Sequence, residues 1–339
     1  MKCQVMFRLP GERQYVRVGG IETAPEKLSD ISQLDGKRGF VFAPFVASQA
    51  TPILLYNVDG AETCDLPEPK QPEFCLRKTI LSDDERSLYA ADFRRFHRLL
   101  TAGDFQKLVL SRSSEWEVDG NVVADELFFR ACRAYPAAFI SLVNTPNHGI
   151  WLMSTPEVLL QMSAGDGYTM ALAGTILATD KPVWSDKNKE EQSLVADYIR
   201  RQLDPFAAEV CVGKPQTVRA ANVMHLRTDI RFSLKSNSDI VRLLDALHPT
   251  PAVCGLPKDE ARKFIIANEN SPRLYYSGFC GLLDVEYRSN LFVSLRCMQL
   301  AGSTIRLYAG GGLIEASNED EEWQETCQKM EAMRMIIDR

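Results

Sequence analysis

Residues 308–330 read YAGGGLIEASNEDEEWQETCQKM, in which three consecutive glycines are followed by a run of acidic residues. The pattern predicts a strand, a glycine-rich turn and then a helix from about residue 318 to residue 337. On that helix Glu322, Glu325 and Lys329 have i, i+3 and i+7 spacing and share one face. In one interpretation the acids complement the helix dipole and stabilise the helix by about 0.3–1 kcal/mol each, while Lys329 pairs with Glu325 on a solvated surface. In the other interpretation the acids surround a cation.

A second acidic helix is expected over residues 185–203, SDKNKEEQSLVADYIRRQL, with Ser185 as its N-cap. Its Glu190 and Glu191 again suit either a solvated helix N-terminus or a cation site. Mg²⁺ in proteins prefers one or two carboxylates, several waters and a substrate anion. Two such helices would therefore suit this ion if they meet in the fold, and both interpretations stay open at this point.

The order of the remaining elements indicates an α+β fold with antiparallel sheets covered by helices, because strands come in adjacent runs rather than in strict βαβ alternation. A length of 339 residues permits one large domain or two ordinary ones. The first 80 residues are expected to be rich in short strands. Further helices are expected at 83–102, 123–136 and 239–250, and strands at 105–113, 138–144, 149–154, 157–163, 215–220, 223–234, 291–300 and 304–312.

Composition excludes several classes of protein. The formal net charge of −6 gives no electrostatic reason to expect nucleic acid, and no GxGxxG or GxxxxGK[ST] motif is present. The nine cysteines are scattered without CxxC spacing, which disfavours zinc and fits reduced thiols in a cytoplasm. The N-terminus lacks the apolar core of a signal peptide, and the apolar run near residues 40–56 is too broken to span a bilayer. We therefore expect a cytoplasmic protein with neither a nucleic-acid nor a membrane partner.

The strand FQKLVLSRS (105–113) places Lys107 on the same face as Val109 and Ser111. One interpretation is an edge strand whose lysine extends outward to solvent. The other is a partly desolvated lysine that can act as a general base.

Three other features each have a structural and a functional interpretation. Glu157 follows Pro156 between two apolar strands; it is a solvated turn residue, or an enclosed carboxyl with a raised pKa that can donate a proton. Arg296 falls inside the expected strand at 291–300, where it would need a carboxylate partner from the protein or a ligand. The glycines at 310–312 make a tight turn or offer backbone N–H groups to an anion. A lone histidine such as His225 is more simply structural.

These stretches, taken together and in order, resemble the chorismate-binding enzyme family. The resemblance covers about residues 83–338, and within the family it favours the isochorismate synthases. It rests on KLVLSR (107–112), STPEVLL (154–160), LAGTI (172–176), DKNKEEQSLVADYI (186–199), VMHLRT (223–228), LHPTPAVCGLP (247–257), YYSGFCG (275–281), VSLR (293–296) and YAGGGLIEASNEDEEWQET (308–326) with Lys329.

The resemblance implies a single large domain in which antiparallel sheets pack as a sandwich with helices outside. Residues 1–80 would be a strand-rich part of that fold, and residues 81–339 the chorismate-binding catalytic region. The implied reaction is an Mg²⁺-dependent isomerisation of chorismate to isochorismate, in menaquinone or siderophore synthesis. The implied partner is the small molecule chorismate, without a glutaminase subunit, in a monomer or weak homodimer.

The resemblance also implies a role for each matching residue. Lys107 would be the base that activates water for attack at C2, where relatives that use ammonia have glutamine instead. Glu157 would be the acid that protonates the departing C4 hydroxyl. Glu191 and Glu325 would bind Mg²⁺, with Glu322 supporting them. The residues expected to hold or line the substrate are Ala173, Thr175, His225, Tyr276, Arg296, Gly310, Gly312 and Lys329.

The chain departs from the family pattern at two positions near these residues and in the length of its N-terminal region, which is shorter than in many relatives. Gln192 stands where relatives usually have a histidine after the glutamate, and Ile176 stands where an arginine often follows the threonine. Three alternative functions are considered. The first is a salicylate synthase, which also eliminates pyruvate, and the second is an anthranilate-type subunit, which Lys107 disfavours. The third is a non-catalytic chorismate-binding relative.

Overall fold

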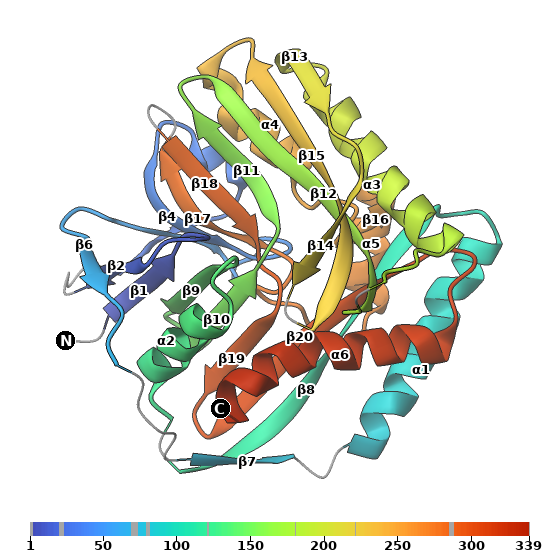
Figure 1. Ribbon diagram of the computed structural model, residues 1–339, viewed down its shortest axis with the longest axis horizontal. Helices are drawn as coiled ribbons and strands as arrows, with labels where there is room; N and C mark the ends of the chain where they lie inside the picture. Colours follow the sequence, from blue (N-terminus) through green and yellow to red (C-terminus); the bar gives the residue numbers. More distant parts are fainter. Residues whose placement is uncertain are drawn as a thin grey trace.

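The computed structural model describes residues 3–19, 24–68, 74–78, 82–120, 122–179, 181–220, 222–284 and 288–338. Within these residues the chain forms two antiparallel sheets of ten strands each and six α-helices (Figure 1). The expected α+β fold is confirmed. No helix in this part of the chain is long and apolar enough to cross a membrane.

The two sheets draw their strands from all along the chain. Sheet A has the order β16 (Gly255–Leu256), β8 (Lys107–Gly120), β20 (Thr304–Leu313), β19 (Cys297–Ala301), β10 (Ile150–Thr155), β9 (Phe139–Asn144), β1 (Cys3–Arg8), β2 (Gln14–Gly19) and β6 (Glu62–Asp65), with β7 (Phe74–Lys78) also paired to β8. Sheet B has the order β13 (Ala207–Val212), β15 (Val223–Leu234), β12 (Asp166–Leu177), β11 (Val158–Ser163), β18 (Arg288–Val293), β17 (Phe279–Asp284), β4 (Arg38–Ala43), β5 (Ile53–Tyr56) and β3 (Glu26–Leu28), with β14 (Gln216–Ala220) on β15.

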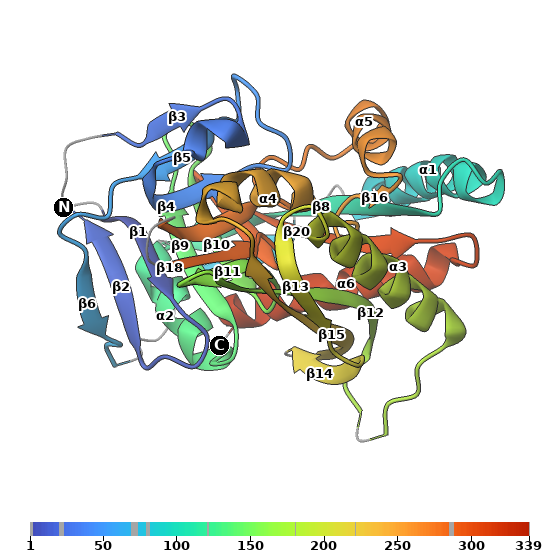
Figure 2. The same cartoon turned by 90° about the horizontal axis from the view of Figure 1, so that it is seen from above.

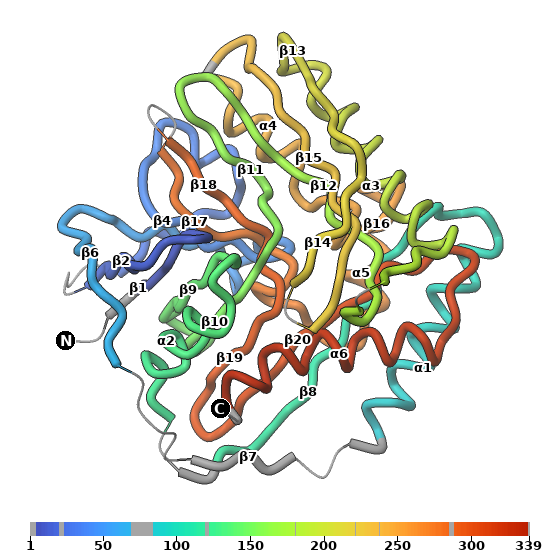
Figure 3. The backbone as a smooth tube through the Cα atoms, viewed as in Figure 1, coloured from blue at the N-terminus to red at the C-terminus, as the bar shows by residue number. Residues whose placement is uncertain are grey.

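The sheets pack face to face over an aromatic core. Phe139 of sheet A stacks on Phe292 of sheet B with ring centroids 4.1 Å apart, and Phe7 contacts Phe40 across the same interface. The first strands of the chain, coloured blue in Figure 3, belong to both sheets. β1, β2 and β6 pair in sheet A, while β3, β4 and β5 pair in sheet B. The expected division between residues 80 and 81 lies outside the described residues.

Helices cover the outer faces of the sandwich (Figure 2). The helices α3 (Asp186–Leu203) and α4 (Ile240–Leu247) bury apolar side chains against sheet B. The helices α2 (Ala124–Ala134) and α6 (Glu319–Asp338) cover sheet A, and α1 (Ser82–Thr101) and α5 (Lys258–Asn268) pack against the β8 end of that sheet. Two short 3-10 helices, Ile31–Leu34 and Asn237–Asp239, precede β4 and α4.

The long periodic helices lie where the sequence predicts them. Ser185 caps α3, because its hydroxyl accepts a hydrogen bond from the backbone N–H of Asn188 and so satisfies one of the free donors of the first turn. The helix α4 ends at Leu247, just before His248 and Pro249, since proline cannot continue a helix. The helix α5 is an addition to the expected set, and only Ala261 and Ile265 of its side chains are fully buried.

One expected strand is wrong. Residues 291–300 form the end of β18 and most of β19, which belong to different sheets. The chain turns between them at 294–296, where Arg296 has a φ of 45°. Such a backbone angle interrupts the extended conformation, so Arg296 lies at a corner rather than inside a strand.

The glycine-rich turn expected at 310–312 is also wrong. All three glycines lie within β20 and pair with Val109, Leu110 and Ser111 of β8. The turn that leads into α6 comes later, after Leu313.

Candidate active site

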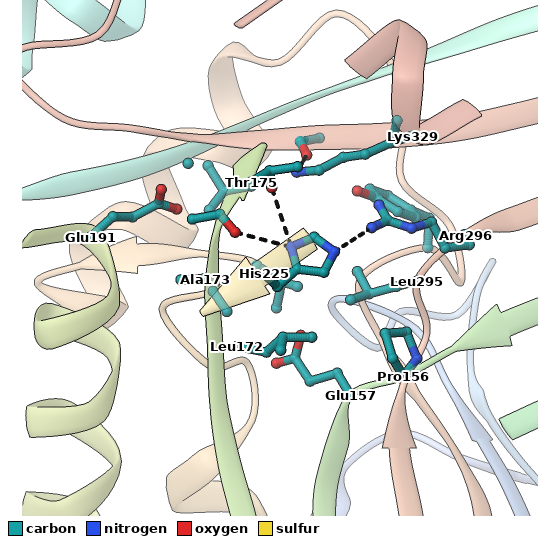
Figure 4. A pocket seen from close by; sticks show the side chains of 18 of the residues that line it. Pro156, Glu157, Leu172, Ala173, Thr175, Glu191, His225, Leu295, Arg296 and Lys329 are labelled. Carbon is teal, nitrogen blue, oxygen red and sulfur yellow. Dashed lines mark hydrogen bonds between the residues drawn. The ribbon is translucent and has the colours of Figure 1, made fainter. Parts of the chain in front are cut away.

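One cavity is lined by residues from two helices, from four strands and from the turns in which the chain passes from one sheet to the other. Figure 4 shows Glu191 reaching it from α3 on one side, Lys329 and Arg296 on the other, and Glu157 below His225. The cavity is lined by most of the residues implied by the family resemblance, which are Glu157, Ala173, Thr175, Glu191, His225, Tyr276, Arg296, Gly310, Gly312 and Lys329. Its other walls are Val109, Pro156, Leu172, Gly174, Ala252, Val253, Leu295, Tyr308 and Ala309.

The two acidic helices meet beside this cavity. Glu191 of α3 and Glu322 and Glu325 of α6, together named the carboxylate cluster, are each paired with a lysine. Lys107 Nζ lies 2.9 Å from Glu191 Oε1, and Lys329 Nζ lies 2.6 Å from Glu325 Oε1. Glu322 pairs with Lys187. The expectation that Lys329 and Glu325 pair is therefore correct, but the pair is largely buried instead of solvated.

The glycines of β20 make room for the cluster. A Cβ atom at residue 311 would lie 2.8 Å from Glu322 Oε2, closer than real Cβ atoms come to other heavy atoms. A Cβ atom at residue 312 would lie 2.9 Å from Lys107 Cε and 3.0 Å from Glu191 Cδ. A side chain at either position would displace the carboxylates, so the glycines here serve close packing rather than a turn.

The carboxylates differ in their affinity for protons. Burial and the neighbouring charge of Glu325 raise the pKa of Glu322 to about 7, although Lys187 acts in the opposite direction. Burial would also raise the pKa of Glu325, but Lys329 and Lys187 outweigh it, and its pKa is lowered below the usual value. For Lys187, burial is outweighed by Glu322 and Glu191, which raise its pKa to about 12.

The cluster has the donor chemistry of a divalent-cation site. Glu322 Oε2 is buried without a hydrogen-bond partner among the described residues, which is costly for a carboxylate oxygen unless a ligand meets it. No three His, Cys, Asp or Glu side chains in the described ranges are gathered closely enough to form a preformed metal site. The carboxylates therefore fit a hard cation by type and burial, while their present partners are lysines.

Lys107 is fully buried at the start of β8. The edge-strand interpretation, with the lysine extending to solvent, is therefore wrong. Lys107 does not line the cavity itself; its ammonium lies behind Glu191, whose carboxylate does.

Glu157 is a buried acid on the cavity wall, at the corner between β10 and β11. Burial raises its pKa to about 8, although Lys107, Arg296 and Lys329 pull in the opposite direction. Its side chain is therefore protonated at neutral pH. Its backbone is held on both sides, because its N–H donates to the Thr155 hydroxyl at 3.2 Å and its carbonyl accepts from Val293 N at 3.0 Å.

His225 and Arg296 form a hydrogen-bonded pair in the cavity. Arg296 donates to His225 Nε2 at 2.8 Å, while His225 Nδ1 lies 3.0 Å from the carbonyl oxygen of Gly174 (Figure 4). Because the carbonyl can only accept, Nδ1 carries the proton and Nε2 is the acceptor. Burial, Arg296 and Lys329 lower the pKa of His225 to about 3, which keeps the ring neutral in this tautomer. His225 thus orients the guanidinium of Arg296.

The backbone of β20 presents donors to the same cavity. The carbonyl of Gly310 accepts a hydrogen bond from Lys329 Nζ at 2.8 Å, so the polar groups of Gly310 point away from β8. Those of Gly312, two residues on, point the same way. Because β19 pairs with β20 only as far as Tyr308, these N–H groups face the side on which β20 has no strand partner in the described ranges.

Three more expected residues complete the walls. Tyr276 is buried, and its hydroxyl would lie 3.0 Å from a Cβ at Gly310. Thr175 lies beside His225, with Oγ1 to Nδ1 3.4 Å, and its hydroxyl also bonds to Glu325. Ala173 is a buried wall residue of β12.

The residue that replaces the usual histidine after Glu191 is well anchored. Gln192 is buried, and its amide nitrogen donates to the carbonyl of Ala171 in β12 and to the Thr228 hydroxyl in β15, both at 3.0 Å. These bonds fix α3 on sheet B directly beside Glu191. Ile176, at the second departure, is half-buried on β12.

Sequence reasoning assigned no role to Lys187, although it lies within the matched stretch 186–199. Its position in the first turn of α3, one helical turn before Glu191, could have identified it, because i and i+4 side chains lie on one face. Ala252 and Val253, within the matched stretch 247–257, also line the cavity, although the resemblance implies no role for them.

Comparison with known proteins gives a consistent result. A family model described as "Chorismate binding enzyme" matches residues 58–338. The chain is 32% identical over 250 residues to isochorismate synthase MenF of Escherichia coli K12, covering 71% of this chain and 58% of that protein. It is 35% identical over 257 residues to the salicylate biosynthesis isochorismate synthase of Pseudomonas aeruginosa, covering 69% of this chain and 51% of that protein.

The chain therefore spans between half and three fifths of the length of these curated relatives. A solved structure of MenF, the menaquinone-specific isochorismate synthase from Escherichia coli, superposes with a TM-score of 0.83 at 24% identity. The superposition covers 99% of this chain and 89% of that one. This likeness supports the two-sheet fold.

Proposed function

The chain belongs to the chorismate-binding enzyme family, and from this membership and its cavity we propose that it is an isochorismate synthase. The reaction is an isomerisation: water adds at C2 of chorismate, the ring double bonds shift, and the C4 hydroxyl leaves. The observation that carries the proposal is one cavity that combines a buried neutral acid, a guanidinium and Glu191, the member of the carboxylate cluster that lines it. Lys107 is bonded to Glu191, while Glu322 and Glu325 are not among the lining residues.

Glu157 is proposed as the general acid. Hydroxide is a poor leaving group, so the departing C4 oxygen needs a proton as the C–O bond breaks. A carboxyl whose pKa is raised to about 8 still holds its proton at neutral pH and can supply it. The leaving group then departs as water.

Lys107 is proposed as the general base. It removes a proton from the water whose oxygen forms the new bond to C2. One proton is taken at Lys107 and one is given at Glu157, so the protons balance over the reaction. This role requires Lys107 in its neutral form, and it requires the water to lie beside Glu191, the residue through which Lys107 adjoins the cavity.

The two substrate carboxylates are proposed to meet donors on the opposite wall. Arg296, oriented by His225, and the hydroxyl of Tyr276 would bind one carboxylate. The backbone N–H groups of Gly310 and Gly312 would bind the other. Ala173, Thr175 and Lys329 would shape the ring pocket and brace these groups.

Mg²⁺ is the proposed metal. Glu191 and Glu325 would hold it, with Glu322 in support, since Glu322 Oε2 is buried without a partner among the described residues. When bound, the ion would supply positive charge to a substrate carboxylate. Replacing Glu325 by Gln should weaken the metal dependence of the activity; an unchanged Mg²⁺ titration would point to another set of ligands.

The remaining assignments follow the same proposal. Residues 81–339 would supply the catalytic region, and residues 1–80 would extend its scaffold. We expect a cytoplasmic monomer or weak homodimer that works without a glutaminase subunit, in menaquinone or siderophore synthesis.

The decisive experiment is product analysis. The purified chain is incubated with chorismate and Mg²⁺, and the products are separated by chromatography with and without EDTA. Isochorismate that forms only without EDTA supports the proposal. Salicylate fluorescence without a partner lyase would instead favour a salicylate synthase, and calorimetric binding of chorismate without turnover would favour a non-catalytic relative.

A further inference from the structure

Lys187 is a buried cation to which the proposed reaction gives no role. Its ammonium pairs with Glu322 Oε1, and only 17% of the lysine side chain and 1% of the glutamate side chain are exposed. The pair joins the first turn of α3 to the first turn of α6, so it forms where the two acidic helices meet.

The charges of all three cluster carboxylates act on Lys187, and it contacts Glu322 directly. The charge of Glu322 acts on its ammonium most strongly, followed by those of Glu191 and Glu325. The other two cluster carboxylates have their own lysines, Lys107 and Lys329. Each of the three carboxylates thus has a lysine of the chain itself as its partner.

We infer that Lys187 is an internal counter-cation that competes with a divalent metal for Glu322 and so lowers the affinity of the carboxylate cluster for that metal. The inference rests on the proposed function in one respect, namely that the cluster binds a divalent cation. It goes beyond it by assigning Lys187 a role that opposes metal loading.

The physical reason is like-charge repulsion at short range. A divalent cation bound by the cluster would lie beside the ammonium of Lys187 in a poorly solvated site, where charges interact strongly. The lysine can yield without unfolding the helix, because its long side chain lies on the first turn of α3 and is partly exposed. Glu322 Oε2 has no hydrogen-bond partner in the described residues, so an ion that reaches this oxygen meets no competing donor there.

The test is calorimetric titration of the full-length chain with MgCl₂ and, separately, MnCl₂, after EDTA treatment and without chorismate. Lys187→Met and Lys187→Gln should both bind the metal at least about 10-fold more tightly than the unmodified chain. The matched control is Lys189→Met, two residues along the same helix, whose side chain is 60% exposed and paired with Asp186. It should leave the affinity unchanged.

Two further measurements keep the inference open to refutation. Adding Glu322→Gln to Lys187→Met should abolish the gain in affinity, because the competition acts through Glu322. In EDTA, Lys187→Met should melt at a lower temperature than the unmodified chain, and Mg²⁺ should raise its Tm more. Lys187→Gln retains a hydrogen-bond donor for Glu322 and is the variant of choice if the methionine variant does not fold.

Unchanged or weaker metal binding by both Lys187 variants would overturn the inference, since it would make the lysine a support for the site rather than a competitor. Absence of metal binding in every variant would overturn it as well. The proposed function stands or falls separately, because the chromatographic assay measures product from chorismate whereas the titration contains no substrate.

Discussion

Two buried charge clusters flank the strand β8, and they differ in how completely their polar groups are satisfied. On the outer side, Arg273 and Glu269 form a bidentate pair, with Arg273 Nε 2.6 Å from Glu269 Oε2. Arg273 also donates to the carbonyls of Val253 and Val109, and Glu269 accepts from the backbone N–H of Ser111. On the inner side, the carboxylate cluster rests on three separate lysines and leaves Glu322 Oε2 without a partner in the described residues.

This difference indicates that the Arg273–Glu269 pair is part of the scaffold and that the carboxylate cluster is part of the candidate site. The Arg273–Glu269 pair binds β8 at Val109 and Ser111, between the stretches that pair with β16 and β7, and holds the loop at Val253, so it fixes one wall of the cavity. A saturated network of this kind gives rigidity. The carboxylate cluster leaves one of its oxygens without a hydrogen-bond partner in the described residues and is paired with flexible lysine side chains. A site that must accept a ligand requires such exchangeable contacts.

The largest effect is expected from Lys107→Ala on the inner side. Loss of a positioned base should lower the rate of chorismate conversion by about 10²–10⁴-fold, measured in steady-state assays. The matched control is Lys189→Ala on the exposed face of α3, which should leave the rate unchanged. If Lys107→Ala converts chorismate at normal speed, the base is another group.

Arg273→Met should break the outer cluster and act on stability instead. Removing the guanidinium leaves Glu269 buried without its partner, which should lower the free energy of unfolding by about 3–5 kcal/mol in urea titrations. Arg242→Met, which removes an exposed partner of Asp239, should cost less than about 1 kcal/mol. A similarly small loss for Arg273→Met would mean that the two clusters do not differ as described.

The third expectation concerns pH. Because the pKa of Glu157 is raised to about 8, its carboxyl is protonated below that pH and ionises as the pH rises through it. The catalytic rate should therefore fall about tenfold per pH unit above this value, as the fraction of protonated acid falls. Glu157→Gln should be slow and should lack this alkaline decline. An unmodified enzyme whose rate stays level well above pH 8 would contradict the role of Glu157.

The smallest effect is expected at the N-cap of α3. Ser185→Ala removes the hydroxyl that accepts from Asn188 N, which should destabilise the chain by about 1 kcal/mol. Ser185→Asp should retain most of the stability. Equal stability of the alanine and aspartate variants, measured by thermal unfolding, would show that α3 is held by its packing on sheet B alone.

The long helices and the residues that line the cavity could both be predicted from the sequence, but from different kinds of signal. The helices α3 and α6 are long and have local signals, such as the cap at Ser185, that do not depend on the rest of the fold. The cavity residues followed from a family resemblance spread over many short stretches. Their roles remain proposals, although the structure gathers them around one cavity.

What the sequence could not supply depends on contacts between distant segments. The run at 291–300 is apolar at seven of its ten positions and contains neither glycine nor proline, so nothing in its pattern marks the corner at Arg296 where the chain changes sheets. Lys107 pairs with Glu191, 84 positions away in the chain, and Lys187 pairs with Glu322, 135 positions away. Local spacing in the sequence carries no information about such long-range pairs. The helix α5 was overlooked because its apolar face is narrow.

Two of the corners at which the chain changes sheets are bonded to each other. The chain leaves sheet A for sheet B at Glu157 and returns from sheet B to sheet A at Arg296. Val293 N donates to the carbonyl of Glu157, and Ser154 N donates to the carbonyl of Arg296. The backbone positions that carry the acid and the guanidinium are thus held together by these paired crossovers, independently of the loops at the periphery of the sheets.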